Sequence, residues 1–273
     1  MPAYNAGATI AESIQSAWAQ SCQPDEIIVG DDASTDRTRE IARDNGAIVL
    51  ELAKGNGAIA RNRAAEKAKG DIFFFLDADD LWAENKIERH LETYDSKHPG
   101  LILDRSQPFR DDDRPVSWTA GRRAEGFFEW QELVNHRHWP SGSGFSVTRE
   151  AYWSVGGFNE SLIKFQDVDF WVRCAHLNPA YSLNEELTHY RIVEGSVSKQ
   201  TKNHEPNLAN VLKGWPFATD SEKRAFEQIA WMMMAERSKW PQALQYLAKA
   251  GSPIGNRFFW KCLLMSFRRT ITG

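Results

Sequence analysis

The sequence predicts an α/β fold with a mostly parallel, doubly wound sheet, and three observations lead to this prediction. Short apolar strand patterns alternate with amphipathic helix patterns through residues 10–103. Acidic residues directly follow two of the apolar runs, at the strand ends where ligands bind in sheets of this class. Beyond residue 200 the strand patterns give way to helical ones, so we expect a helical C-terminal extension.

The predicted elements alternate in order along the first hundred residues. Helices are expected over residues 7–21, Thr38–Asn45, Asn56–Lys69 and from about Glu84. Strands are expected over Asp25–Gly30, Ala47–Leu52, Ile72–Leu76 and Leu101–Leu103. Only Met1–Tyr4 precede the first helix, although a strand should feed it. Either this helix opens the fold unusually, or the sequence lacks its first strand.

The chain between residues 104 and 200 is predicted to be less regular. We interpret the polar, charge-mixed residues 104–126 as a surface excursion in which the triple Asp at 111–113 is solvated. The composition of residues 139–146 is typical of a Gly/Ser loop. The remaining expected elements are a helix over Arg149–Val155, a turn at Gly156–Glu160, a helix from Phe165 to Arg173 and a short strand over Thr188–Ile192.

Composition narrows the class of protein. Hydrophobic residues make up 42% of the chain and charged residues 26%, which fits a globular domain. The net charge of −4 gives no reason to expect nucleic acid as a partner. The three cysteines lie too far apart for a disulfide framework, and they indicate a reducing compartment. The sequence has no run of 18 apolar residues and no signal-peptide pattern, so we expect a cytoplasmic protein.

The stretch Gly70–Trp82, GDIFFFLDADDLW, carries the strongest functional signal. Its apolar run ends in Asp77, Asp79 and Asp80, and Asp77 and Asp79 would share one side of an extended chain. Carboxylates crowded at the end of an apolar strand repel one another, and desolvating them is costly unless a positive charge is present. A divalent cation shared with substrate phosphates answers this need. The alternative is a solvated acidic turn that caps the next helix.

Two other site types were weighed. Gly55–Ala60 matches the dinucleotide pattern G-x-G-x-x-A between a strand and a helix, with Asp77 about twenty residues further on. An NAD-dependent oxidoreductase would leave Asp79, Asp80 and the cluster Asp31–Asp36 without a role, because recognition of the ribose needs only one acid. Glycoside hydrolysis also uses paired carboxylates, but it does not explain two acidic clusters on a sheet of this type.

Six motifs, taken in order, are similar to those of family 2 glycosyltransferases of the GT-A fold. They are Pro2-Ala3-Tyr4-Asn5, Asp31-Asp32-Ala33-Ser34-Thr35-Asp36, Ala60-Arg61-Asn62, Leu76-Asp77-Ala78-Asp79-Asp80, Gly156-Gly157-Phe158-Asn159-Glu160 and Gln166-Asp167-Val168-Asp169. The resemblance covers about residues 1–198. It implies a Rossmann-like, mostly parallel sheet flanked by helices, with a nucleotide-binding part over about 1–104, an acceptor part over about 105–200 and a helical extension over 201–273.

The resemblance also implies an activity. Family members transfer a sugar, with inversion, from a nucleoside-diphosphate-sugar that is usually a UDP-sugar, and they use Mn²⁺ or Mg²⁺. We expect the acceptor to be a saccharide or a lipid-linked glycan of a cell-surface polysaccharide or glycolipid.

Residue roles follow from the positions that match the family motifs. Pro2 and Tyr4 would line the base and ribose site, and Asp32 would hydrogen-bond the uracil, with Arg61 assisting. Asp77 and Asp79 would hold the ribose and the metal, with Asp80 as the competing metal ligand. Asp167 would be the general base that takes the proton of the acceptor hydroxyl.

Three departures from the family pattern support an alternative. The strand ahead of the Pro-x-Tyr-Asn motif is missing, and we attribute this to a mis-assigned start or a truncated gene. Gln166 stands where the family has Glu before the base, and Val193 stands where a His near the diphosphate is often found. Together these departures suggest, as the competing hypothesis, a non-catalytic remnant that only binds the sugar nucleotide.

The final segment, Gly255–Gly273, has the pattern of a basic amphipathic helix. Phe259, Leu263 and Phe267 fall on one helical stripe, and Arg257, Lys261 and Arg268 share another face. Such a helix can lie on an anionic membrane surface, at the inner face for a cytoplasmic protein. It can equally pack its apolar stripe on the domain, and the sequence does not separate these two possibilities.

Overall fold

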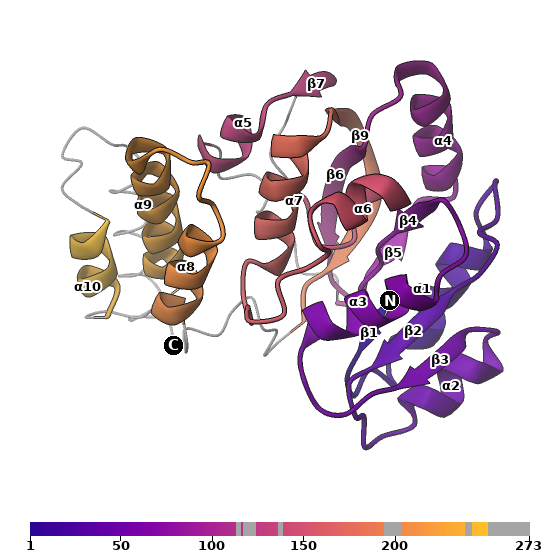
Figure 1. The fold of residues 1–273 in the computed structure, drawn as a ribbon. Helices are drawn as coiled ribbons and strands as arrows, with labels where there is room; N and C mark the ends of the chain where they lie inside the picture. The colour runs from indigo at the N-terminus through magenta and orange to yellow at the C-terminus, as the bar shows by residue number, and fades with distance from the viewer. Residues whose placement is uncertain (113–115, 117–123, 136–138, 194–203, 238–241, 251–273) are drawn as a thin grey trace. The chain divides into compact units, whose positions relative to one another are not determined.

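The computed structural model describes the chain except for residues 113–115, 117–123, 136–138, 194–203, 238–241 and 251–273 (Figure 1). The chain divides into two compact units. The first comprises Met1–Leu133 and His138–Val193, and the second comprises Val134–Arg137 and Glu194–Gly273.

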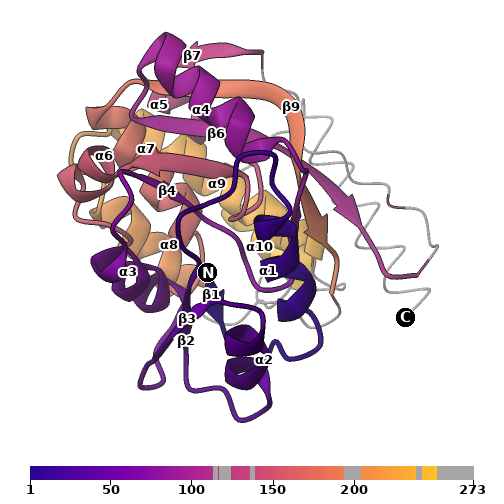
Figure 2. The same ribbon diagram turned by 90° about the vertical axis from the view of Figure 1, so that its right-hand side faces the viewer.

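A three-stranded parallel sheet begins the first unit. Its order is β1 (Pro2–Ala3), β2 (Ile28–Asp31) and β3 (Ile48–Glu51). The connecting helices are α1 (Ile10–Trp18), α2 (Thr38–Asp44) and α3 (Gly57–Lys67). Figure 2 shows α3 on one side of this sheet and α1 and α2 on the other, which is the doubly wound arrangement.

The first strand, β1, consists of two residues of the Pro-x-Tyr-Asn motif. Pro2 and Ala3 pair in parallel with Gly30 and Asp31, and the Met1 carbonyl accepts a hydrogen bond of 2.9 Å from the Gly30 amide. Because β1 lies within the Pro-x-Tyr-Asn motif, the absence of an apolar strand ahead of this motif stays a prediction. Pro2 has no N–H to donate, so the pairing uses the carbonyls of Met1 and Ala3, and the Ala3 carbonyl accepts from the Asp32 amide at 2.8 Å.

A second, mixed sheet completes the unit. Its order is β4 (Ile72–Phe74), β8 (Phe145–Thr148), β6 (Leu101–Phe109), β9 (Ala180–Arg191) and β5 (Leu81–Trp82), with β7 (Gly126–Phe128) also paired to β9. Among these pairs, β6 and β9 run parallel and the others are antiparallel. The remaining helices of this region are α4 (Lys86–Lys97), α5 (Trp130–Asn135), α6 (Arg149–Ser154) and α7 (Gln166–Leu177). The α/β class is confirmed.

Three predicted segments differ from the structure. The predicted surface excursion begins too early, because β6 continues to Phe109 and Asp104 is buried in it beside Lys86. The predicted Gly/Ser loop contains the start of β8, and the predicted short strand at 188–192 is the end of the twelve-residue β9. Asp111, expected to be solvated, is 69% exposed and also pairs with Arg191. In each case a polar residue has a partner distant in sequence, which local pattern does not reveal.

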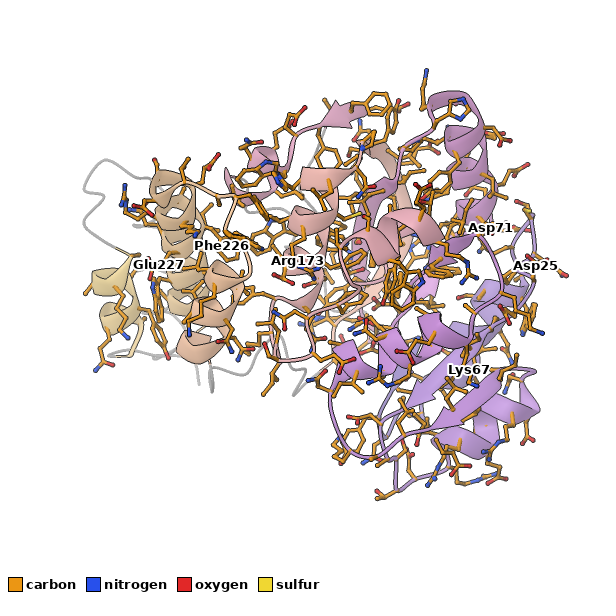
Figure 3. The ribbon with its side chains drawn as sticks, in the orientation of Figure 1. Asp25, Lys67, Asp71, Arg173, Phe226 and Glu227 are labelled. Carbon is orange, nitrogen blue, oxygen red and sulfur yellow. The ribbon has the colours of Figure 1, made fainter. Side chains whose placement is uncertain are left out.

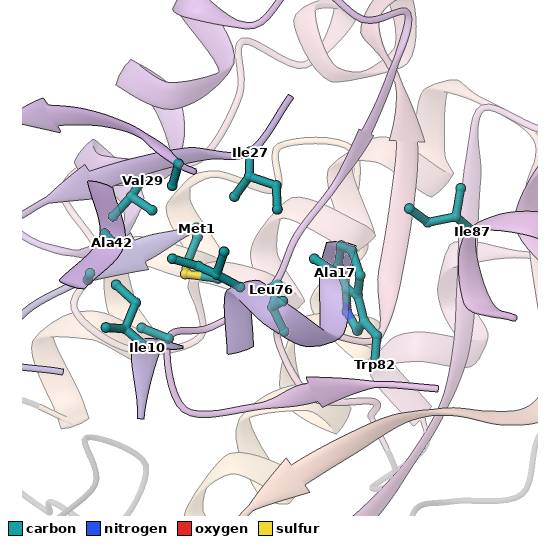
Figure 4. Close-up of a cluster of buried hydrophobic side chains, with 13 residues drawn as sticks. Met1, Ile10, Ala17, Ile27, Val29, Ala42, Leu76, Trp82 and Ile87 are labelled. Atoms are coloured by element: carbon teal, nitrogen blue, oxygen red, sulfur yellow. The ribbon is translucent and has the colours of Figure 1, made fainter. Parts of the chain in front are cut away.

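Two groups of buried side chains hold the unit together. One lies between α1, the parallel sheet and β5 (Figure 4), and it contains Ile10, Ile14, Val29, Leu76 and Trp82. The other is aromatic and joins β4, β8, α6 and α7. In that group Phe75 stacks on Phe145 with ring centroids 4.7 Å apart, and Phe158 stacks on Phe170 at 4.6 Å. Burying each such ring contributes about 1.5–3 kcal/mol, so the aromatic group fixes α7 beside the end of β4.

The second unit is helical in its described part. It contains α8 (His204–Lys213), α9 (Asp220–Arg237) and α10 (Gln242–Lys249). The rings of Trp231 on α9 and Tyr246 on α10 stack at 5.7 Å. The predicted basic helix over 255–273 lies outside the described residues. Within the part of the chain that the structure describes, no helix combines the length and apolar character that crossing a membrane requires.

Candidate active site

The acidic loop that follows β4 separates its three carboxylates. Asp80 is fully buried: its Oδ2 accepts a hydrogen bond from the Ser143 hydroxyl at 2.6 Å, and its Oδ1 accepts one from the Arg191 amide at 2.9 Å. Asp77 and Asp79 keep part of their surface exposed. Asp80 is therefore engaged inside the protein, whereas Asp77 and Asp79 face the accessible side of the loop.

This loop holds more negative charge than its surroundings balance. Burial, together with the charge of Asp77, raises the pKa of Asp79 to about 6. Burial also raises the pKa of Asp80 well above its usual range, and the charges of Asp77 and Asp79 add to this effect. Such a site favours binding of a cation.

Arg61 joins three elements at the end of β4. From α3, its Nη2 donates to Asp77 Oδ1 at 2.6 Å and its Nη1 donates to Gln166 Oε1, the first residue of α7, at 3.0 Å. Its side chain is 10% exposed. The resemblance assigned Arg61 to the uracil site, but the structure places its guanidinium on Asp77 and Gln166. Because Gln166 keeps a carbonyl oxygen there, it accepts this bond without adding a charge.

Asp167 lies in the first turn of α7, directly after the residue that Arg61 contacts. Burial raises the pKa of its carboxyl, while the hydrogen bond from the Val168 amide (2.9 Å) and the charge of Arg61 oppose this shift. The side chain remains partly accessible. The preceding residue, Phe165, adopts φ of 60°, a left-handed conformation that is costly for an aromatic residue. A strained backbone therefore sets the direction in which α7 begins.

The position of α7 is fixed by a second arginine. Arg173, labelled in Figure 3, donates to the carbonyls of Val155 (2.8 Å) and Gly157 (2.9 Å) and pairs with the buried Asp169 at 2.7 Å. Two of the three acidic and amide residues of the Gln166–Asp169 motif thus have structural partners, Gln166 and Asp169. Asp167 differs from both: among the described residues, its carboxylate accepts a hydrogen bond only from the Val168 amide of its own helix.

A third group of residues gathers at the ends of β1 and β2. Asp32 accepts from the Gly55 amide at 2.5 Å and pairs with Lys54 at 2.8 Å. The Lys54 ammonium lies 3.0 Å from the centre of the Tyr4 ring, which is 51% exposed. Pro2 is in β1, one residue before Ala3 pairs with Asp31. The structure therefore brings Tyr4 and Asp32 together around Lys54, a residue that the sequence analysis did not identify.

The start of α3 does not match a dinucleotide site. The Asn56 side chain caps this helix by accepting from the amides of Ala58 (2.9 Å) and Ile59 (3.1 Å), and the Gly55 amide binds Asp32. In a dinucleotide site of the G-x-G-x-x-A type, these amides would have to bind the pyrophosphate. They are already bonded within the protein, which disfavours the oxidoreductase alternative.

Comparison with known proteins identifies the family. The sequence model of the family described as Glycosyl transferase family 2 matches residues 1–156. The chain belongs to glycosyl transferase family 2. It is 30% identical over 243 residues, 84% of this chain and 90% of the relative, to a Bacillus subtilis protein provisionally named teichuronic acid biosynthesis glycosyltransferase TuaG. It is 28% identical to the Escherichia coli UDP-Glc:α-D-GlcNAc-diphosphoundecaprenol β-1,3-glucosyltransferase WfaP, over 77% of this chain and 83% of that protein.

The solved structures of TarS and of the mannosyltransferase PcManGT have the same fold as this family 2 chain. Staphylococcus aureus TarS 1-349 in complex with UDP-GlcNAc aligns with a TM-score of 0.68 and 16% identity, covering 98% of this chain and 87% of TarS. The mannosyltransferase PcManGT from Pyrobaculum calidifontis, in complex with GDP-Man and Mn²⁺, aligns with a TM-score of 0.62 and 18% identity, covering 99% and 80%. These likenesses confirm the GT-A fold.

The acidic loop of this glycosyltransferase fits a cation that takes only part of its coordination from protein. Among the described residues, no group of three or more His, Cys, Asp or Glu side chains could hold a metal on its own. Asp79 and the outer oxygen of Asp77 offer two hard ligands, and the raised pKa of Asp79 reflects a carboxylate without enough positive charge beside it. Mn²⁺ or Mg²⁺ would complete its coordination with water and donor phosphates.

Proposed function

We propose that this family 2 chain is a metal-dependent, inverting glycosyltransferase that transfers a sugar from a UDP-sugar to an acceptor hydroxyl. The observation that supports this proposal best is the Arg61 bridge. One guanidinium binds both Asp77, on the donor loop, and Gln166, next to Asp167. A carboxylate suited to removing a proton is thereby held beside the loop suited to holding a nucleotide sugar.

The proposed reaction is a single displacement at the anomeric carbon. The acceptor oxygen forms a bond to this carbon as the bond to the diphosphate oxygen breaks, and UDP leaves with the electron pair. Asp167 accepts the proton of the acceptor hydroxyl, and its raised pKa makes it a stronger base than an ordinary aspartate. No covalent intermediate forms on the protein, so the configuration inverts.

The other site residues bind the donor in this proposal. Pro2, Tyr4 and Asp32 would hold the uracil and ribose, with Asp77 and Asp79 near the ribose and diphosphate. Asp79 and Asp77 would hold Mn²⁺ or Mg²⁺, and Asp80 is the less suited alternative ligand. The bound metal would act as a Lewis acid that stabilises the leaving diphosphate. Arg61 would orient Asp77 and Gln166 rather than contact the base.

The proposed acceptor is a saccharide carried on a lipid, at the cytoplasmic side of the membrane. The names of the relatives support this, because one refers to teichuronic acid and another to a diphosphoundecaprenol-linked sugar. Contact of residues 255–273 with the membrane remains part of the same proposal. Deleting these residues should reduce sedimentation of the protein with anionic liposomes, and equal sedimentation would contradict membrane contact through this segment.

The test is release of UDP from UDP-Glc, with MnCl₂ and α-D-GlcNAc-diphosphoundecaprenol as acceptor. Asp167→Asn should lower turnover by about 10²–10⁴-fold. Asp95→Asn is the matched control, because it makes the same chemical change at an exposed carboxylate on another helix, α4. Binding of UDP without turnover by the unaltered protein, across several acceptors and donors, would favour the remnant hypothesis. Thermal stabilisation by NAD rather than by UDP with manganese would contradict the donor assignment.

A further inference from the structure

Ser143 lies at the centre of hydrogen bonds that reach the acidic loop from the protein interior. Its Oγ accepts from the Asp77 amide at 2.9 Å and donates to Asp80 Oδ2 at 2.6 Å. Its carbonyl oxygen accepts from Trp82 Nε1 at 3.2 Å. One fully buried serine therefore bonds to residues at both ends of the loop, and its burial excludes direct contact with a substrate.

A buried ion pair lies on the other side of Ser143. Lys86 Nζ contacts Asp104 Oδ2 and donates to Thr188 Oγ1 at 3.0 Å. The Thr188 hydroxyl donates to Asp104 Oδ1 at 2.7 Å, and its oxygen lies 3.3 Å from the Ser143 carbonyl oxygen. The Lys86 and Asp104 side chains are 0% exposed. Lys86, Asp104 and Thr188, here called the core triad, come from α4, β6 and β9 and meet behind the loop.

Glycines on either side of Ser143 leave its segment no room to shift. A Cβ at Gly142 would lie 3.0 Å from Asp77 Oδ2, and one at Gly144 would lie 2.8 Å from the Pro140 Cβ and 2.9 Å from Ser106 Oγ. The segment thus packs closely against the donor loop on one side and against Ser106 of β6 on the other.

A buried ion pair is a poor way to gain stability, because desolvating two charges costs several kcal/mol that their attraction only partly offsets. Such a pair, once fully hydrogen-bonded, does fix the relative position of the elements that supply it. Here those elements surround Ser143. The ion pair therefore helps to fix the distance between Asp77 and Asp80. These two residues form the ends of the turn that contains Asp79.

We propose that Ser143 is a positioning residue of the donor site and that the core triad holds Ser143 in place. This inference rests on the proposed function, because it requires Asp77 and Asp79 to bind the donor. Ser143 orders the loop so that both carboxylates face the diphosphate before the donor arrives. Without its hydroxyl the Asp77 amide and the Asp80 carboxylate lose their common partner, and the loop must be ordered when UDP binds.

The test is calorimetric titration of UDP in saturating MnCl₂. Ser143→Ala should weaken UDP binding by about tenfold, which is typical when a residue supporting metal or substrate ligands is removed. The matched control is Ser146→Ala, because Ser146 is equally buried but its hydroxyl bonds His90 and Tyr94, away from the loop.

The outcomes are distinguishable. Equal UDP affinity of Ser143→Ala and Ser146→Ala, at similar loss of melting temperature, would overturn the positioning role while leaving the proposed function intact. Failure of the unaltered protein to bind UDP would overturn the proposed function, and this inference with it. If Ser143→Ala does not fold, Thr188→Val, which replaces the hydroxyl by a methyl group of the same shape, should weaken UDP binding in the same direction. Unchanged affinity of Thr188→Val would then contradict the proposal.

Discussion

Asp167 and Asp169 illustrate how two carboxylates on one helix turn can have opposite environments. Asp169 is fully buried and pairs with Arg173 at 2.7 Å. Among the described residues, no arginine hydrogen-bonds to Asp167, and burial raises the pKa of its carboxyl. The charge of Asp169 is stabilised by the fold, whereas the charge of Asp167 is held at a cost in stability. Such a cost is common where a group serves chemistry rather than folding.

This difference predicts opposite effects of the same substitution on stability. A carboxyl whose pKa is raised by folding destabilises the folded state once the pH exceeds its unfolded pKa, because the folded state then favours the protonated form. Asp167→Asn should therefore raise the free energy of unfolding, more at pH 8 than at pH 5, in urea titrations. Asp169→Asn should lower it at both pH values. A loss of stability for Asp167→Asn equal to that of Asp169→Asn would contradict this account.

Ala33, which follows Asp32 of the proposed donor site, has a strained backbone. It adopts φ of 60° directly after Asp32, a left-handed conformation that costs a residue with a side chain about 1 kcal/mol. Ala33→Gly should raise the free energy of unfolding by about 0.5–1 kcal/mol in urea titrations. Ala42→Gly, inside α2, is the control and should lower it by a similar amount. A destabilising effect at both positions would show that the turn is not strained.

Sequence reasoning found the residues whose chemistry is visible in a motif, and it missed those defined by distant partners. The Asp77–Asp80 loop could be predicted because charge crowded after an apolar run is unusual in any context. Lys54 and Ser143 could not, because each acts on a residue more than twenty positions away. The sequence does contain one indication of Lys54, because a single lysine follows the strand beside the acidic cluster Asp31–Asp36. For Ser143, flanked by glycines in a loop, no local signal exists.

At the scale of elements, α3 connects the proposed donor site to α7, the helix that contains Asp167. Its Asn62 side chain accepts from the Phe158 amide (2.9 Å) and the Tyr152 hydroxyl (2.6 Å) and donates to the Phe158 carbonyl (2.9 Å). Gly157, with φ of 71°, allows this approach, since a Cβ there would lie 2.7 Å from Asn62 Oδ1. The next residue toward the N-terminus on α3 is Arg61, so this contact also sets the position of the Arg61 bridge.

Removing the Asn62 side chain should therefore be costly. Asn62→Ala would leave the Tyr152 hydroxyl and Phe158 backbone groups buried without partners, and we expect the free energy of unfolding to fall by about 2–4 kcal/mol. The control is Arg63→Ala on the same helix, whose exposed pairs with Glu66 and Glu160 should contribute about 0.5 kcal/mol or less. Urea denaturation of both variants checks the prediction. A cost for Asn62→Ala no larger than that for Arg63→Ala would contradict the role of this contact.

Helices and parallel strands of the first hundred residues could be predicted because each has its own periodic pattern. The mixed sheet could not be predicted in the same detail. β6 contains the buried charge of Asp104, so its pattern breaks where the strand continues. β8 is four residues long and follows a Gly/Ser segment, and β9 contains Asn184, Glu185 and Glu186 in its middle. Pairing with distant strands, rather than local pattern, determines these elements.

At the scale of the whole molecule, a buried polar network lies where α4, β6, β8 and β9 meet. His90 is fully buried, 2.7 Å from Ser146 Oγ and 3.1 Å from Asp104 Oδ2. Burial lowers its pKa to about 4, and the neighbouring charge of Lys86 acts in the same direction while Asp104 opposes it. The protein is thus stable with His90 neutral, and protonating this ring must weaken the junction between the four elements.

The expected pH dependence follows from this shift. Between about pH 4 and 6.5 the unfolded chain binds a proton at His90 that the folded protein does not, so stability falls as the pH falls through this range. Lowering the pH from 6.5 to 5 should cost about 2 kcal/mol through His90. His90→Gln should show a smaller loss over the same range. Protonation of Asp79 below pH 6 changes the free energy of unfolding in the opposite direction. The unaltered protein and His90→Gln are therefore compared with each other at each pH. Equal pH dependence of the two would contradict a neutral His90.

In the proposed site Asp79 binds the donor and Asp167 removes the proton of the acceptor, and one measurement separates these two roles most directly. UDP is titrated calorimetrically in saturating MnCl₂ into the unaltered protein, Asp79→Asn and Asp167→Asn. The account predicts that Asp79→Asn loses at least about tenfold in UDP affinity, whereas Asp167→Asn binds UDP as tightly as the unaltered protein. Unchanged UDP affinity in Asp79→Asn, or an equal loss in both variants, would contradict it.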